Sequence, residues 1–129
     1  MANLNNRLES LETALVRLEE VCAIENLSDI ERDSLILRFQ FSFELLWKCG
    51  KDYLAEVEGI SAASPRRVIR HCCELEIISE EQAQELLRAA DDRNLSAHTY
   101  DEELARKLET RIKKYAPLFR EFFINLQSA

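Results

Sequence analysis

The residues of this chain best suited to chemistry lie together, in the segment 91–100. Arg93 precedes His98 by five positions, and Tyr100 follows two positions after the histidine. Histidine exchanges protons near neutral pH, and arginine binds phosphate through two parallel hydrogen bonds. Such a pair could cleave RNA without a metal ion. The histidine would act on the ribose 2′-hydroxyl or the leaving oxygen, while the arginine would hold the scissile phosphate and stabilise its charge.

The same segment interrupts a helical pattern of apolar residues. That pattern predicts a core-facing stripe and consists of Ala83, Leu86, Leu87 and Ala90. One turn further, the stripe lands on Arg93 and Asn94, where a charge is costly unless it is paired, hydrated or at an interface. We therefore expect function at this point. The simpler interpretation is an arginine that reaches solvent and a histidine that caps a helix end.

The spacing of Arg93 and His98 imposes a geometric condition. Five residues of α-helix turn through roughly 500°, which leaves the two side chains about 140° apart. Both can face one site only if the helix unwinds near His98. A capping box formed by Thr99 and Glu102 favours this, because it would start a new helix there. Two copies related by a two-fold axis would bring two arginines and two histidines into one cleft.

The elements that must position this segment are all helical. Only two glycines and two prolines occur among 129 residues, and leucine, glutamate, alanine and arginine are abundant. Capping boxes at Ser28 and Ser79, and a cap followed by proline at Ser64, mark helix starts. We predict helices over about 4–22, 29–58, 65–75 and 80–97, and a fifth after Thr99 with a kink or break at Pro117. The prediction is one domain over residues 1–129, an all-α, up-and-down four-helix bundle with an additional short helix.

The second helix is apolar nearly all round, which predicts that it meets another subunit. The first of its three faces consists of Leu35, Phe39, Ser42, Leu46, Gly50, Tyr53 and Val57. The second consists of Leu37, Phe41 and Leu45, and the third of Phe43, Trp47 and Leu54. Glu44, Lys48 and Lys51 form a polar line on the same helix. This line is either an ion pair along the helix or a polar wall beside Arg93 and His98.

The bulk charge limits the possible partners. A net charge of -7 and a pI near 4.9 exclude a protein that coats nucleic acid non-specifically. Any contact with RNA must therefore come from a local patch, for which Arg66, Arg67 and Arg70 are the candidates. Most such clusters are simply solvated faces, and that interpretation stays open.

No metal site or cofactor is expected from the sequence. The four cysteines form no C-x-x-C pair, and we interpret them as reduced core or interface thiols. The sequence has neither a signal-peptide pattern nor an apolar run long enough to cross a membrane, which predicts a cytoplasmic protein.

Three blocks of the sequence resemble the HEPN superfamily, in its branch of nucleotidyltransferase substrate-binding proteins (HepT-like toxins). The first is Arg93, four residues, His98, one residue and Tyr100. The others are Phe39-Gln40-Phe41-Ser42-Phe43-Glu44-Leu45-Leu46-Trp47-Lys48 with Lys51-Asp52-Tyr53-Leu54, and Ser64-Pro65-Arg66. The resemblance covers essentially the whole chain.

The resemblance implies a dimeric helical bundle whose two motifs face a shared cleft. It implies a metal-independent ribonuclease toxin, paired with a minimal nucleotidyltransferase of the MNT type that transfers AMP to the tyrosine of the motif. Carried over to this chain, Arg93 and His98 would be catalytic and Tyr100 the modification site. Asn94, Glu44 and Lys48 would support the cleft.

Two other functions stay open. The chain could be a non-catalytic subunit that presents a substrate to the nucleotidyltransferase, which the acidic net charge fits slightly better. It could also be a structural bundle whose site has decayed, although the intact Arg93 and His98 speak against that.

Overall fold

The computed structural model describes residues 2–99 and 101–129, and within them it contains five helices and no strand. The helices are α1 (Ala2–Cys22), α2 (Asp29–Val57), α3 (Pro65–Glu74), α4 (Glu80–His98) and α5 (Glu102–Ser128). The predicted helical bundle with one short additional helix is confirmed. No helix in the described residues is long and apolar enough to cross a membrane.

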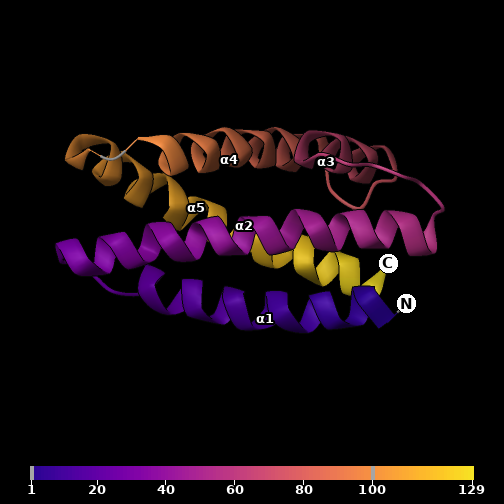
Figure 1. The fold of residues 1–129 in the computed structure, drawn as a ribbon, viewed down its shortest axis with the longest axis horizontal. Coiled ribbons are helices and arrows are strands. Elements are labelled where there is room, and N and C mark those ends of the chain that lie inside the picture. Colours follow the sequence, from indigo (N-terminus) through magenta and orange to yellow (C-terminus); the bar gives the residue numbers. More distant parts are fainter. Residues whose placement is uncertain (1, 100) are drawn as a thin grey trace.

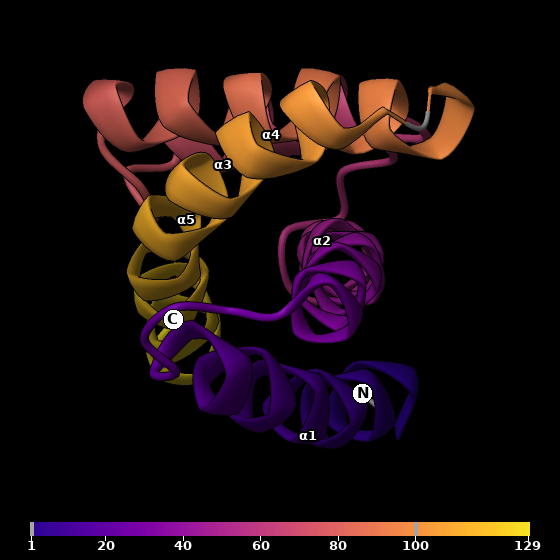
Figure 2. The same cartoon turned by 90° about the vertical axis from the view of Figure 1, so that its left-hand side faces the viewer.

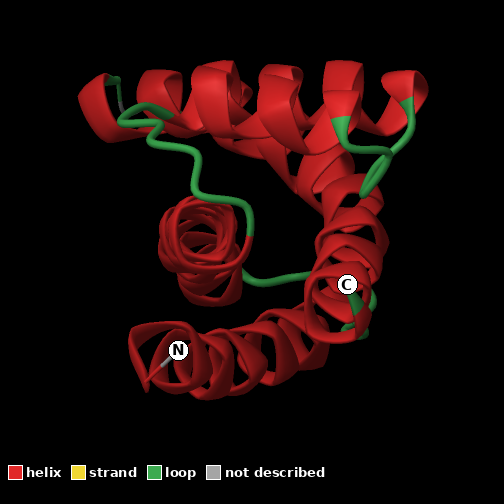
Figure 3. Ribbon diagram, turned by 90° about the vertical axis from the view of Figure 1, so that its right-hand side faces the viewer, coloured by secondary structure: helices red, strands yellow, loops and turns green. Residues whose placement is uncertain are grey.

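The bundle is built around α2. Figure 1 shows α1 along one side of α2 and the pair α3 and α4 along the opposite side, while α5 runs diagonally behind α2. In Figures 2 and 3, α2 is seen almost end-on, with α5 covering one flank. No described helix covers the other flank. This arrangement leaves one side of α2 open along much of its length.

The helix boundaries follow the local signals in the sequence. The hydroxyls of Ser28 and Ser79 each accept a hydrogen bond from the backbone N–H three residues on. In return, the side-chain oxygens of Glu31 and Gln82 accept from the backbone N–H of Ser28 and of Ser79. The turn after α2 uses Gly59, whose φ of +69° is one that side chains disfavour.

One boundary prediction is wrong. The N-cap of α5 is Asp101, whose carboxylate accepts from the Leu104 N–H at 2.8 Å, so the predicted cap at Thr99 is not used. Of the kink or break predicted at Pro117, the break is absent, because α5 continues through this residue to Ser128. Pro117 is exposed, so its ring causes no conflict with the core.

The core lies where α5 crosses α2. Phe39 and Phe119 stack with ring centroids 6.0 Å apart, and Tyr115 stacks on Phe39 at 5.8 Å. Nearby, Gly50 allows α3 to approach α2, since a Cβ on this residue would lie only 2.7 Å from Val68 Cγ1. Burial of such rings supplies most of the stabilisation in a bundle of this size.

All four cysteines are free, as expected for reduced thiols. Cys49 and Cys72 are buried, and burial raises the pKa of each thiol to about 12. Both therefore stay protonated at neutral pH and act as small apolar side chains.

The three predicted apolar faces of α2 have different surroundings. The first is buried except at Val57, and Phe43 and Leu54 of the third are also buried. The second face is not covered: Leu37 is 52% exposed and Phe41 61%, while Leu45 is half-buried. These three residues, called the open apolar face below, lie on the uncovered flank of α2.

Candidate functional site

Arg93 projects from α4 toward α2 and is held there by an ion pair. Its Nη2 donates to Glu44 Oε2 at 3.0 Å, and Lys48 Nζ lies 3.2 Å from Glu44 Oε1. The Arg93 and Glu44 side chains are 35% and 31% exposed. The structure thus brings together three residues that the sequence placed on two separate helices. The half-buried guanidinium keeps further N–H groups facing solvent, where an anion could bind.

Glu44 is held in its charged form. Burial alone would raise its pKa, but the Trp47 indole, the Lys48 ammonium and the Arg93 guanidinium together lower the pKa of this carboxyl. The Trp47 N–H lies close to the carboxylate without a well-oriented hydrogen bond. A charged Glu44 flanked by two cations fixes the direction of the Arg93 side chain.

His98 is the last residue of α4 and is exposed. Its imidazole makes no hydrogen bond or ion pair with any residue that the structure describes. The helix ends near His98, as expected, but it does not unwind before this residue, because the Thr99 N–H donates to the Leu95 carbonyl at 3.0 Å and completes the last turn. Arg93 and His98 therefore stay about 140° apart around the helix. Within one subunit Arg93 faces α2 while His98 faces outward.

The neighbours of this pair are polar. Asn94 is exposed, and its Oδ1 accepts a hydrogen bond of 3.3 Å from Arg93 Nη1. Ser96 Oγ donates to the Arg93 carbonyl at 2.9 Å and accepts from Gln40 Nε2 at 2.8 Å, which ties α4 to α2. The candidate modification site, Tyr100, lies outside the described residues.

Asp92 is a buried residue that the sequence analysis missed. It is 8% exposed, accepts from the Tyr115 hydroxyl at 2.6 Å and from Arg111 Nη1 at 2.9 Å, and so links α4 to α5. Burial, together with this carboxylate, raises the pKa of the Tyr115 hydroxyl, which stays the donor. The signal in the sequence was a spacing of three from Ala89, which is also buried.

The arginines on α3 lie apart from the Arg93 pair. Arg66 forms an ion pair with Asp91, which precedes Arg93 by two residues, and Arg67 and Arg70 are exposed. On an ideal helix Asp91 and His98 face similar directions, about 10 Å apart along the axis. Arg66 therefore lies beside the surface of α4 on which His98 lies.

Clusters suited to holding a metal ion are absent from the described part of the chain, where no three His, Cys, Asp or Glu side chains gather.

Comparison with solved structures finds the same fold in several proteins. A protein of Thermus thermophilus matches with a TM-score of 0.86 and 41% identity, over 90% of this chain and 98% of that one. A mutant of the MntA–HpeT toxin–antitoxin complex contains a chain that matches with a TM-score of 0.82 and 16% identity, over 100% of both chains. A tri-AMPylated Shewanella oneidensis HEPN toxin in complex with an MNT antitoxin matches with a TM-score of 0.79 and 16% identity, over 98% and 97%.

Comparison with curated proteins found no match. A family model described as nucleotidyltransferase substrate binding protein like matches residues 6–128. This match spans almost the whole chain and includes the segments around Glu44 and Arg93. The protein therefore belongs to the nucleotidyltransferase substrate binding protein like family.

Proposed function

We propose that this protein is the ribonuclease toxin of a toxin–antitoxin pair, with Arg93 and His98 as its catalytic residues. Arg93 holds the scissile phosphate, and His98 transfers the proton of the 2′-hydroxyl or of the leaving oxygen. No metal ion takes part. A partner nucleotidyltransferase of the MNT type silences the toxin by transferring AMP to Tyr100. The membership of the family and the likeness to toxins in complex with antitoxins support this proposal.

The observation that carries the proposal is the place of the Arg93–Glu44 pair beside the open apolar face. Glu44 follows Leu37 by seven residues, and Lys48 follows Phe41 by seven, so each polar residue lies two turns along the same side of α2. Apolar residues exposed to this extent at a helix flank favour contact with a second subunit. A second copy on this face would meet Arg93 at the edge of the contact.

Dimerisation also removes the geometric difficulty within one subunit. The side chains of Arg93 and His98 on one helix point about 140° apart, so a single subunit does not direct both at the same point. Two copies related by a two-fold axis through the open apolar face would combine their arginines and histidines at one cleft. We therefore propose that the homodimer is the catalytic unit and that the exposed Arg66, Arg67 and Arg70 contact the RNA backbone beyond it.

The open apolar face predicts a dimer in solution. The wild-type protein is expected to run at twice the monomer mass in size-exclusion chromatography with light scattering at micromolar concentration. Phe41→Glu places a charge in the contact and should give a folded monomer. The matched control is Ile124→Glu, a similarly exposed apolar residue on α5, which should remain dimeric. A wild-type monomer, or a dimer that survives Phe41→Glu, would contradict this interface.

Tyr100 is expected to accept AMP. Incubation with the partner nucleotidyltransferase and ATP should increase the intact mass by one or more AMP units, and Tyr100→Phe should lower the number of AMP groups added. Tyr53→Phe is the control, because this tyrosine is buried and bonded to Glu58. Labelling of Tyr100→Phe that equals wild-type labelling would show that another residue is modified.

A non-catalytic subunit that presents a substrate to the nucleotidyltransferase is the second candidate. The specific observation in its favour is that Glu44 neutralises Arg93, which weakens the attraction of Arg93 for phosphate. The acidic net charge favours it as well. RNA incubated with purified wild-type protein separates the two functions, since this second candidate leaves the RNA intact.

A further inference from the structure

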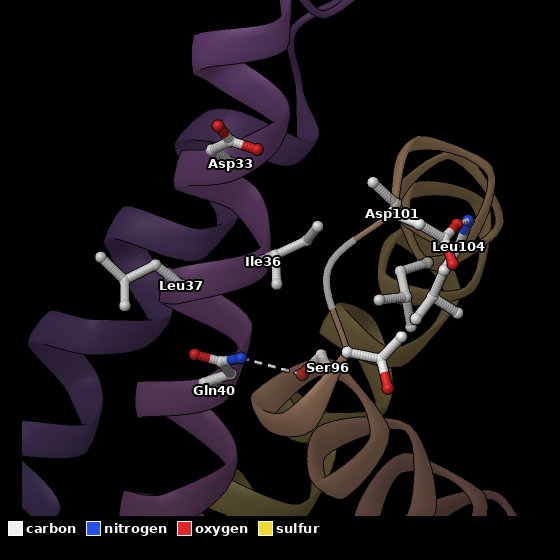
Figure 4. A pocket seen from close by; sticks show the side chains of 10 residues that line it. Asp33, Ile36, Leu37, Gln40, Ser96, Asp101 and Leu104 are labelled. Atoms are coloured by element: carbon white, nitrogen blue, oxygen red, sulfur yellow. Dashed lines mark hydrogen bonds between the residues drawn. The ribbon is translucent and has the colours of Figure 1, made fainter.

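A pocket of about 180 Å³ opens between α2 and the junction of α4 with α5. Figure 4 shows its two sides, with Ile36 and Leu37 on α2 and Leu104 on α5. Sites for drug-sized ligands usually span about 300–1,000 Å³. This pocket is smaller, so it suits one ring system and not a whole nucleotide. Its apolar walls on opposite sides fit the two faces of a flat ring.

One polar edge in the pocket is fixed in orientation. Gln40 Nε2 donates to Ser96 Oγ, and the Ser96 hydroxyl donates its own proton to the Arg93 carbonyl. The Gln40 carbonyl oxygen and second N–H are left without a partner among the described residues. A side-chain amide with a free acceptor and a free donor pairs with adenine, accepting from the amino group at N6 and donating to a ring nitrogen.

The charge at the rim selects against anions. The carboxylates of Asp33 and Asp101 both line the pocket, and Asp101 is held in place by the Leu104 N–H. Carboxylates accept hydrogen bonds from amino groups and repel phosphate. The ligand that fits is therefore an uncharged ring that donates hydrogen bonds, with any phosphate attached to it remaining outside.

We propose that this pocket binds a nucleobase with an exocyclic amino group, and that adenine matches the Gln40 edge best. The pocket lies about one helical turn from Arg93. Ser96, which lines the pocket, is three residues after Arg93 on α4 and donates to the Arg93 carbonyl. The base could belong to an RNA strand that crosses Arg93, or to an adenylyl group or free adenine nucleotide. Only this assignment of the source rests on the proposed function, while binding of the base does not.

Titration with AMP and with IMP tests base binding directly. IMP has the same ring size but carries a carbonyl group in place of the amino group. AMP should shift the backbone NMR signals of Ile36, Ser96 and Leu104, and IMP should bind about tenfold more weakly. Gln40→Met keeps the side-chain length without the amide and should weaken AMP binding about tenfold. Gln84→Met, at an exposed position of α4, should leave AMP binding unchanged.

Equal binding of AMP and IMP, an unchanged affinity in Gln40→Met, or shifts confined to other parts of the chain would overturn the proposal. Short RNAs with one adenine or one inosine then identify the source. Faster cleavage beside adenine, lost in Gln40→Met, assigns the pocket to the RNA strand. Cleavage indifferent to the base, with AMP binding abolished by prior adenylylation, assigns it to the adenylyl group. RNA that stays intact while AMP binds would refute the ribonuclease and leave the base pocket supported.

Discussion

Replacing His98 by alanine is expected to lower the rate of RNA cleavage by at least about 100-fold, because a positioned proton-transfer group contributes about 10²–10⁴-fold to such a reaction. The wild-type protein, expressed without its partner, should inhibit growth, and the His98→Ala variant should not. The side chain is exposed and makes no bond to any described residue, so its removal should leave the far-ultraviolet circular dichroism and the dimer unchanged. Cleavage of labelled RNA, followed on denaturing gels, measures the effect.

The chain supplies its own control for this variant. His71 is the second histidine, lies on α3 and is 3.8 Å from Glu74, away from Arg93. His71→Ala should cleave at the wild-type rate, and wild-type cleavage should persist in excess chelator if no metal ion takes part. Equal loss in both variants would indicate a general effect on the fold. A His98→Ala protein that cleaves RNA normally, or a wild type that does not cleave, would refute the catalytic role.

Asp92→Ala is expected to lower the free energy of unfolding by about 2–3 kcal/mol, since hydrogen bonds to a charged group contribute about 1.5–3 kcal/mol and a buried donor left unpaired costs about 1–3. The variant leaves the buried Tyr115 hydroxyl without its acceptor. It also removes one of the ties between α4 and α5 at the residue that precedes Arg93. The midpoint of urea unfolding, read by circular dichroism, should fall accordingly.

Asp91→Ala is the matched control for Asp92→Ala, because the two residues are adjacent on α4. Asp91 carries the same side chain, but it is exposed and paired with the exposed Arg66. Asp91→Ala should therefore cost less than about 1 kcal/mol. Similar losses in the two variants would show that the Asp92–Tyr115 bond contributes little. A larger loss in Asp92→Ala would establish it as the stabilising contact of the site.

The helices were predictable from the sequence because their signals are local. Capping boxes at Ser28 and Ser79 satisfy backbone groups within four residues of themselves, and the structure uses both. The cap at Thr99 was a false signal, since Asp101 two residues on satisfies the same need. Pro117 does not break α5, because a proline on the exposed side of a long, packed helix need not end that helix.

The sequence by itself determined which residues could do chemistry, where α2, α3 and α4 begin, and that α2 has more apolar surface than one bundle covers. These properties depend on residue type and spacing alone. Only the tertiary structure decided which polar side chains of α4 face the core, which face α2 and which face solvent. Periodicity gives relative direction around a helix but not its absolute rotation against α2 and α5. Packing set that rotation so that Asp92 is buried against Tyr115, Arg93 meets Glu44, and His98 points outward.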